Sequence, residues 1–145
     1  MRLPPDEARR RFAMAHVARL ATITPDGRPH LVPMTFALDG ETIYSVVDAK
    51  PKEDVALARL RNVAANPQVS LLADEYADDW AQLWWVRADG HAMVVTEGAD
   101  RDHAIQLLRA KYPQYADSSL PFGAATVVAV DRWTGWAAGR IFAVS

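Results

Sequence analysis

The fold is decided by residues 17–47, which read VARLATITPDGRPHLVPMTFALDGETIYSVV. Three runs rich in β-branched and apolar residues are separated by two turn signals, Pro25-Asp26-Gly27 and Asp39-Gly40. Such turns need a positive φ, which glycine adopts without steric cost. The stretch therefore predicts three consecutive antiparallel strands, over 17–24, 30–38 and 41–47.

Helices and further strands are predicted on both sides of this stretch. Apolar residues recur at helical spacing over 6–15, 53–65 and 100–112. Strand-forming runs occupy 69–73, 83–96, 124–130 and 136–144. The 83–96 run reads either as one long strand or as a hairpin bent near Asp89-Gly90. Hairpin-connected strands interrupted by helices predict a mainly β fold, an antiparallel barrel of about six strands with peripheral helices, the first of them an N-terminal cover.

Length and composition predict one globular domain spanning residues 1–145. The chain is 50% hydrophobic and 23% charged, close to the globular average. Its net charge of −2 argues against general nucleic-acid binding, because a phosphate-binding surface needs a basic excess. The absence of cysteine excludes disulfides and thiolate catalysis and predicts a cytoplasmic protein. The longest uncharged run, 118–130, is too short to span a membrane, so no membrane partner is expected.

The common catalytic and cofactor motifs do not occur. No GxSxG elbow, GxGxxG loop or Walker loop is present. The four histidines, which lack the spacing of a zinc site, predict no metal centre: His16, His30, His91 and His103. Arg9, Arg10 and Arg11 are read as a solvated helix face, the usual state of a charge run.

A basic loop is the clearest candidate for anion binding. Lys50-Pro51-Lys52 follows a predicted strand and precedes a predicted helix, where backbone N–H groups and the helix dipole favour a phosphate. Arg59, further along that helix, offers another donor. An ordinary basic loop, partly neutralised by Glu53 and Asp54, explains the spacing equally well, so both interpretations stay open.

Proline and tryptophan give two further clues. Pro33 lies within a predicted strand and cannot donate to a ladder, which indicates an edge strand or a bulge. All five tryptophans lie in the second half of the chain. Tryptophan is common at interfaces and at planar-ligand sites, although a single tryptophan more often packs in a core.

The motifs in order resemble one superfamily over about residues 12–140. They are VARLATIT at 17–24, PDGRPHLVPM at 25–34, IYSVV at 43–47, KPK at 50–52 and RLRNVAANP at 59–67. This progression resembles the split β-barrel pyridoxamine 5′-phosphate oxidase superfamily, and within it the branch of deazaflavin (coenzyme F420)-dependent enzymes. DDW at 78–80 and LWWVRADG at 83–90 are similar to one subgroup of that branch.

The resemblance implies a cofactor site shared between two subunits of an obligate homodimer. From one subunit it assigns the cofactor phosphate to Lys50, Lys52 and Arg59, the adjoining wall to Tyr44 and Ser45, and the face of the tricyclic ring to Val32, Pro33 and Met34. From the other subunit it assigns Trp85, Arg87, Trp136 and Arg140.

The resemblance implies an F420-dependent oxidoreductase that transfers a hydride between the reduced deazaflavin and an unsaturated small molecule. No general acid or base is assigned, and the proton comes from solvent or from Tyr44. Two alternatives remain: an FMN-dependent enzyme of the pyridoxamine 5′-phosphate oxidase type, and a protein that binds F420, flavin or a tetrapyrrole without turnover.

Overall fold

A computed structural model describes residues 1–48, 54–117 and 121–139 of the chain. Its helices are α1 (Pro5–Met14), α2 (Asp54–Ala65) and α3 (Ala99–Lys111), with short 3-10 turns η1 (Trp80–Gln82) and η2 (Pro113–Tyr115). Its strands are β1 (Ala18–Ile23), β2 (Pro29–Met34), β3 (Ala37–Asp39), β4 (Thr42–Asp48), β5 (Gln68–Glu75), β6 (Trp84–Val95) and β7 (Phe122–Ala137). The predicted mainly β class with peripheral helices is confirmed.

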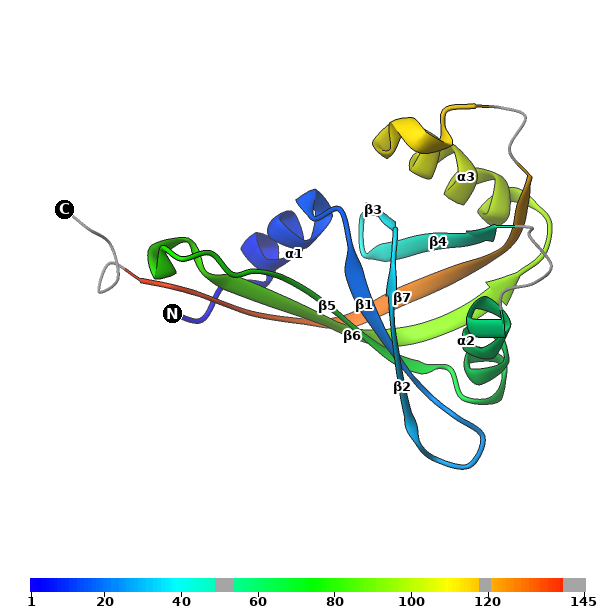
Figure 1. The fold of residues 1–145 in the computed structure, drawn as a ribbon, viewed down its shortest axis with the longest axis horizontal. Coiled ribbons are helices and arrows are strands. Elements are labelled where there is room, and N and C mark those ends of the chain that lie inside the picture. The colour runs from blue at the N-terminus through cyan, green and yellow to red at the C-terminus, as the bar shows by residue number, and fades with distance from the viewer. Residues whose placement is uncertain (49–53, 118–120, 140–145) are drawn as a thin grey trace.

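The strands form one antiparallel sheet in the order β2-β1-β5-β6-β7-β4-β3 (Figure 1). The prediction of a six-stranded barrel is wrong in two respects. The sheet has seven strands, and among the described residues it is not closed, because β2 and β3 are its two ends. The strand predicted over 30–38 is two strands: β2 pairs with β1, the chain leaves the sheet at Thr35-Phe36, and β3 then pairs with β4.

The break predicted between the final two strands, over 131–135, is wrong, because these residues lie within one strand; residues 140–144 of the second predicted strand lie outside the described residues. β7 runs without a turn from Phe122 to Ala137 and pairs with β6 along almost its whole length, while its first half also pairs with β4. The sequence predicts a break in this region, between the runs 124–130 and 136–144. Ladder hydrogen bonds to two neighbouring strands outweigh such local signals.

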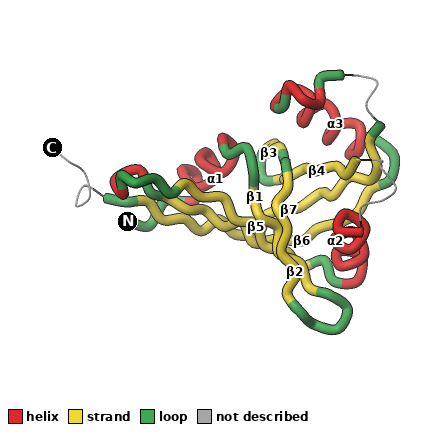
Figure 2. The backbone as a smooth tube through the Cα atoms, viewed as in Figure 1, coloured by secondary structure: helices red, strands yellow, loops and turns green. Residues whose placement is uncertain are grey.

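The alternatives for 83–96 are resolved in favour of one strand with a bulge opposite it. The register between β6 and β7 shifts at Asp89-Gly90, and Asp131 is the extra residue on β7. A bulge bends its strand and increases the local twist. Beyond the bend, β6 and β7 continue with β5 as a long projection that carries α1 alongside it, and the N-terminus lies at this side of the molecule (Figures 1 and 2).

The two faces of the sheet bury different helices. The larger core includes Phe12 of α1 and Leu20, Leu71 and Val86 of the sheet, all at most 1% exposed. A second core forms where Ala104 and Leu108 of α3 pack against β4 and β7. Ile43 belongs to the first core and Tyr44 to the second, as alternation along a strand requires.

The predicted turn glycines and the unusual proline are explained by the sheet. Gly27 and Gly40 have φ of 87° and 62°, which confirms both hairpin signals. Pro33 lies on the edge strand β2, opposite Arg19 of β1. An edge position tolerates a residue without an N–H donor, so the edge-strand reading of Pro33 is confirmed.

Candidate functional site

The basic part of the predicted site is only partly visible. Lys50, Lys52 and Arg140 lie outside the described residues, so their predicted roles stay predictions. Arg59 lies on α2 and is half-buried. This helix packs against β1 and β6, and Asn62 from it donates a hydrogen bond of 3.1 Å to Thr22 of β1. The helix that follows the basic loop is thus fixed to the sheet.

The three consecutive residues of β2 present two different faces. Val32 and Met34 are 8% and 6% exposed and pack in the larger core, whereas Pro33 is exposed on the opposite face. The side chain that β2 offers to a ligand on its open face is therefore Pro33, with the adjoining backbone.

Tyr44 and Ser45 also point to opposite faces of β4. The Ser45 hydroxyl donates a 2.9 Å hydrogen bond to the carbonyl of Thr35, which holds the link between β2 and β3. Tyr44 packs edge-on against His103 of α3, with ring centroids 5.2 Å apart. Burial raises the pKa of the Tyr44 hydroxyl, with smaller contributions from the carboxylates of Asp100 and Asp39. Tyr44 therefore stays protonated at neutral pH and remains able to donate a proton.

Trp85 and Trp136 form a cross-strand pair on the β6–β7 projection. Arg87, two residues along β6, lies on the same face as Trp85 and donates to Asp89 at 3.1 Å, while the Ser70 hydroxyl donates to the other oxygen of Asp89 at 2.6 Å. The two half-buried indoles form a surface that suits a planar ligand, and the charge of Arg87 beside them is paired with Asp89.

The two halves of the predicted site lie far apart within one chain. Tyr44 lies opposite Val127 of β7, and Val127 lies opposite Met93 of β6. Met93 is eight residues from Trp85 along β6. At a rise of about 3.3 Å per residue, this places Trp85 about 26 Å along the sheet from the level of Tyr44. One small ligand does not reach both positions in a single chain.

A cavity of about 440 Å³ at the end of α3 was not predicted from the sequence. Its lining comes from the start of β1, the β2–β3 link and the end of α3: His16, Val17, Thr35, Lys111, Tyr112, Pro113, Gln114 and Tyr115. The Tyr112 hydroxyl accepts from the backbone N–H of Phe36, and its proton is shared between the carbonyls of Phe36 and His16. A lysine in the last turn of a helix is an ordinary sequence feature, so no signal pointed to this site.

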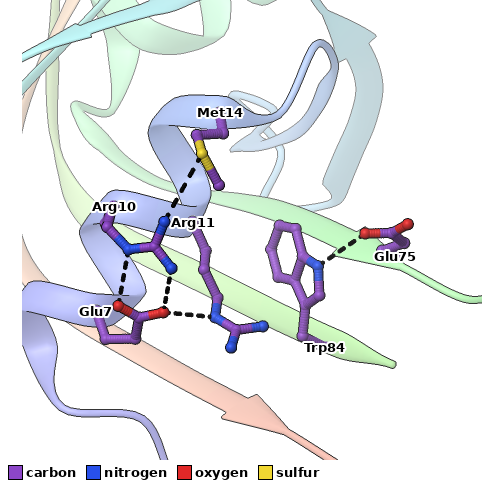
Figure 3. Close-up of polar contacts among 6 residues, drawn as sticks. All are labelled: Glu7, Arg10, Arg11, Met14, Glu75 and Trp84. Carbon is purple, nitrogen blue, oxygen red and sulfur yellow. Dashed lines mark hydrogen bonds and ion pairs between the residues drawn. The ribbon is translucent and has the colours of Figure 1, made fainter. Parts of the chain in front are cut away.

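The arginine-rich face of α1 is internally neutralised (Figure 3). Arg10 and Arg11 both bind Glu7, at 2.6 and 2.9 Å. Hydrogen bonds from Arg10 and then Arg11 lower the pKa of Glu7 to about 2. Arg11 lies over Trp84, whose indole N–H donates to Glu75 at 3.1 Å. These ion pairs are consistent with the prediction that the charge run lies on a solvated helix face.

Metal-binding clusters and membrane-spanning helices are both absent from the described residues. Within residues 1–48, 54–117 and 121–139, no cluster of three or more histidine, aspartate or glutamate side chains is arranged to hold a metal ion. The helices in those ranges include none with the length and apolar character needed to cross a membrane.

Comparison with solved structures shows the same mainly β fold in several bacterial proteins. A conserved hypothetical protein from Mycobacterium tuberculosis superposes with a TM-score of 0.77 at 21% identity, covering 99% of this chain and 90% of that one. An FAD-binding protein from Mesorhizobium loti gives 0.73 at 21% identity, covering 96% and 98%. An FAD-binding protein from Mycobacterium smegmatis gives 0.65 at 20% identity, covering 94% and 96%.

These likenesses define the class as an antiparallel sheet with helices on both of its faces. The family model of pyridoxamine 5′-phosphate oxidase matches residues 4–137, so the chain belongs to this family. Curated protein sequences gave no match.

Proposed function

We propose that this protein is an F420-dependent oxidoreductase that acts as a homodimer, with each cofactor site shared between two chains. The observation that carries the proposal is the separation of about 26 Å between the level of Tyr44 and the Trp85–Trp136 pair. In the proposed homodimer the projection of one chain would lie against the β2 and β4 region of its partner, which would bring the two halves of the site together.

The residues of the chain fit a planar, anionic cofactor. The paired indoles of Trp85 and Trp136 offer apolar surface for a planar ring, with Arg87, which is ion-paired to Asp89, beside them. Lys50, Lys52 and Arg59 would hold the phosphate. When bound, a reduced deazaflavin supplies the hydride. The chain's own residues would bind and orient it, and the proton would come from solvent or from Tyr44, which is protonated at neutral pH.

A flavin is the second candidate cofactor. Two proteins of the same fold are named FAD-binding, and the same basic and aromatic residues suit FMN. Titration of the purified protein with F420 and with FMN, followed by tryptophan fluorescence, separates the two. Tighter binding of F420 supports the proposal, and much tighter binding of FMN contradicts it.

A protein that binds the cofactor without turnover is the remaining rival. Adding a panel of unsaturated acceptors to the protein with reduced F420 addresses it. Acceptor-dependent oxidation of the cofactor supports an enzyme, whereas tight binding with no oxidation above the protein-free rate supports the binding protein.

The shared site is tested by complementation between two defective variants. Lys52→Ala and Trp85→Ala each damage a different half of every site in their own homodimers. After mixing and subunit exchange, each heterodimer contains one intact site and one doubly defective site, so about a quarter of all sites regain binding in an equal mixture. Recovery of F420 binding to that level supports a shared site. No recovery, despite exchange shown by mass spectrometry of tagged subunits, contradicts it.

A further inference from the structure

The link between β2 and β3, residues Thr35 and Phe36, is held by side chains rather than by a ladder. β2 and β3 are the two ends of the sheet, yet only these two residues separate them in the chain. No ladder joins β2 to β3 within the part of the chain that the structure describes. The backbone groups of the link therefore need other hydrogen-bond partners, because buried N–H and C=O groups are costly to leave unpaired.

Two buried hydroxyls supply these partners. The Ser45 hydroxyl of β4 donates to the carbonyl of Thr35 at 2.9 Å. The Tyr112 hydroxyl, just after α3, accepts from the backbone N–H of Phe36 at 3.1 Å. Its own proton is shared between the carbonyls of Phe36 and His16, at 3.0 and 2.8 Å. Ser45 and Tyr112 are 2% and 7% exposed, so both side chains are shielded from water.

The side chains of the link are held as well. The Phe36 ring is fully buried in the larger core, with its centroid 4.7 Å from that of Phe12. The Thr35 hydroxyl lies 3.0 Å from the Tyr115 hydroxyl, and one of the two donates to the other. Contacts from α1, from β4 and from the end of α3 thus converge on two adjacent residues. Such a supporting shell fixes a segment in one conformation before any ligand binds.

The link continues the strand that would face the cofactor ring. Pro33 is exposed on the open face of β2, two residues before Thr35. Because β2 is an edge strand, the ladder to β1 holds it on one side only, and that ladder ends at Met34, opposite Ala18. Beyond this point the link sets the position of the chain. The orientation of Pro33 and its backbone therefore depends on how firmly Thr35 and Phe36 are held.

We propose that Ser45 and Tyr112 are positioning residues of the cofactor site, which fix the link and thereby the face that Pro33 offers to the ring. This inference rests on the proposed function. It changes the role of Ser45: because its side chain is 2% exposed and its hydroxyl is donated to Thr35, Ser45 acts through the link and not by touching the cofactor. Tyr112, from outside the predicted site, acts on the same link.

The test compares Ser45→Ala and Tyr112→Phe with the parent protein, well below the melting temperature of each. Each variant removes one hydroxyl from the link and adds no bulk. Trp133→Phe is the control, because it also removes one side-chain hydrogen bond, from an indole N–H that donates to Glu41 and not to the link. F420 is titrated into each protein, and binding is followed by the fluorescence anisotropy of the cofactor ring. The exchange rate of the Phe36 amide is measured without cofactor.

We expect Ser45→Ala and Tyr112→Phe each to bind F420 about 3- to 10-fold more weakly than the parent, the usual effect of one lost hydrogen bond. At saturating F420 the anisotropy of the bound ring should fall, because a less firmly held face leaves the ring more freedom. A loss of stability alone does not change this anisotropy. The Phe36 amide should exchange faster in Tyr112→Phe, and Trp133→Phe should match the parent in all three measurements.

Parent-like affinity and anisotropy in both Ser45→Ala and Tyr112→Phe would overturn the proposal, as would an equal change in Trp133→Phe. An unchanged exchange rate of the Phe36 amide in Tyr112→Phe would overturn it whether or not a cofactor binds. Failure of the proposed function is seen in the parent instead. Much tighter binding of FMN contradicts the F420 assignment, and the same comparison of variants is then made with FMN; a parent that binds neither cofactor contradicts the proposed function and this inference together.

Discussion

Gly90 of β6 lies directly against the backbone of Ala129 on β7. A Cβ atom built on Gly90 would lie far inside van der Waals contact with the carbonyl oxygen of Ala129. This contact is at the register shift where Asp131 bulges from β7. Glycine is therefore required at the point where the projection that carries Trp85 and Trp136 bends away from the rest of the sheet.

The first prediction concerns this bend. Gly90→Ala should lower the free energy of unfolding by about 1–3 kcal/mol, because the atom it meets belongs to the backbone and has little room to move. Gly135→Ala is the comparison, since its added Cβ meets only side chains of Leu3, Val86 and Ala8 at 3.0 to 3.2 Å. Urea denaturation of both variants should show the smaller loss for Gly135→Ala. Equal losses would mean that the backbone contact at Gly90 has no special cost.

The second prediction concerns the tyrosine that ties α3 to the β2–β3 link. Tyr112→Phe leaves the N–H and carbonyl of Phe36 without their partner in a buried site, so we expect a loss of about 1–3 kcal/mol of stability. Tyr115→Phe removes only the half-buried contact with Thr35 and should cost about 0.5–1.5 kcal/mol. Chemical denaturation of both variants measures the two losses in unfolding free energy, with the same dependence on denaturant concentration (m-value) used for each. A larger effect at Tyr115 would contradict this account.

The third prediction is a pH dependence of stability caused by Lys111. Its pKa is about 8 in the folded protein and 10.5 in its ordinary state, so between these values the unfolded chain binds more protons than the folded one. Stability contributed by Lys111 therefore rises as pH increases from about 8 to about 10.5, and its penalty is fully present below pH 8. Relative to the parent, Lys111→Met should be most stable at pH 7 and should lose this advantage by pH 10.5. A difference in melting temperature that does not change with pH would contradict the prediction.

The fourth prediction concerns the basic loop. Lys52→Ala should weaken F420 binding by about 1.5–3 kcal/mol without changing the melting temperature, since one charge-assisted contact to phosphate is lost from a loop. Binding to the parent protein should also weaken as salt rises. Arg28→Ala is a suitable control, because Arg28 is an exposed cation of the β1–β2 turn that pairs with Asp26. Equal affinity of Lys52→Ala and the parent would remove Lys52 from the site.

The fifth prediction links assembly to binding. If the site is shared, dilution that separates the dimer should abolish cofactor binding, and bound cofactor should shift the dissociation to lower protein concentration. Light scattering over a dilution series, with and without F420, measures both effects. A species of about 16 kDa that binds F420 with full affinity would contradict the shared site.

Single residues with special backbone geometry were enough to predict two turns and one edge strand. Gly27 and Gly40 set the turns, and Pro33 indicated an edge strand, because each acts through its own backbone geometry. The same local reading failed for β7, where the sequence predicts a break between the runs 124–130 and 136–144. The ladders to β6 and β4 extend through that region as one strand, and only the pairing itself could reveal this.

The sequence by itself determined the strand-rich class, the turns, the three helices and the residues available for an anionic cofactor. The tertiary structure decided that Tyr44 and Trp85 lie at different levels of one sheet, which is a matter of register between strands distant in sequence. It also decided that the Lys111 ammonium is buried over Phe36, with no acceptor among the described residues. Burial and register arise from contacts between segments far apart in the chain, and no short stretch of sequence contains both partners.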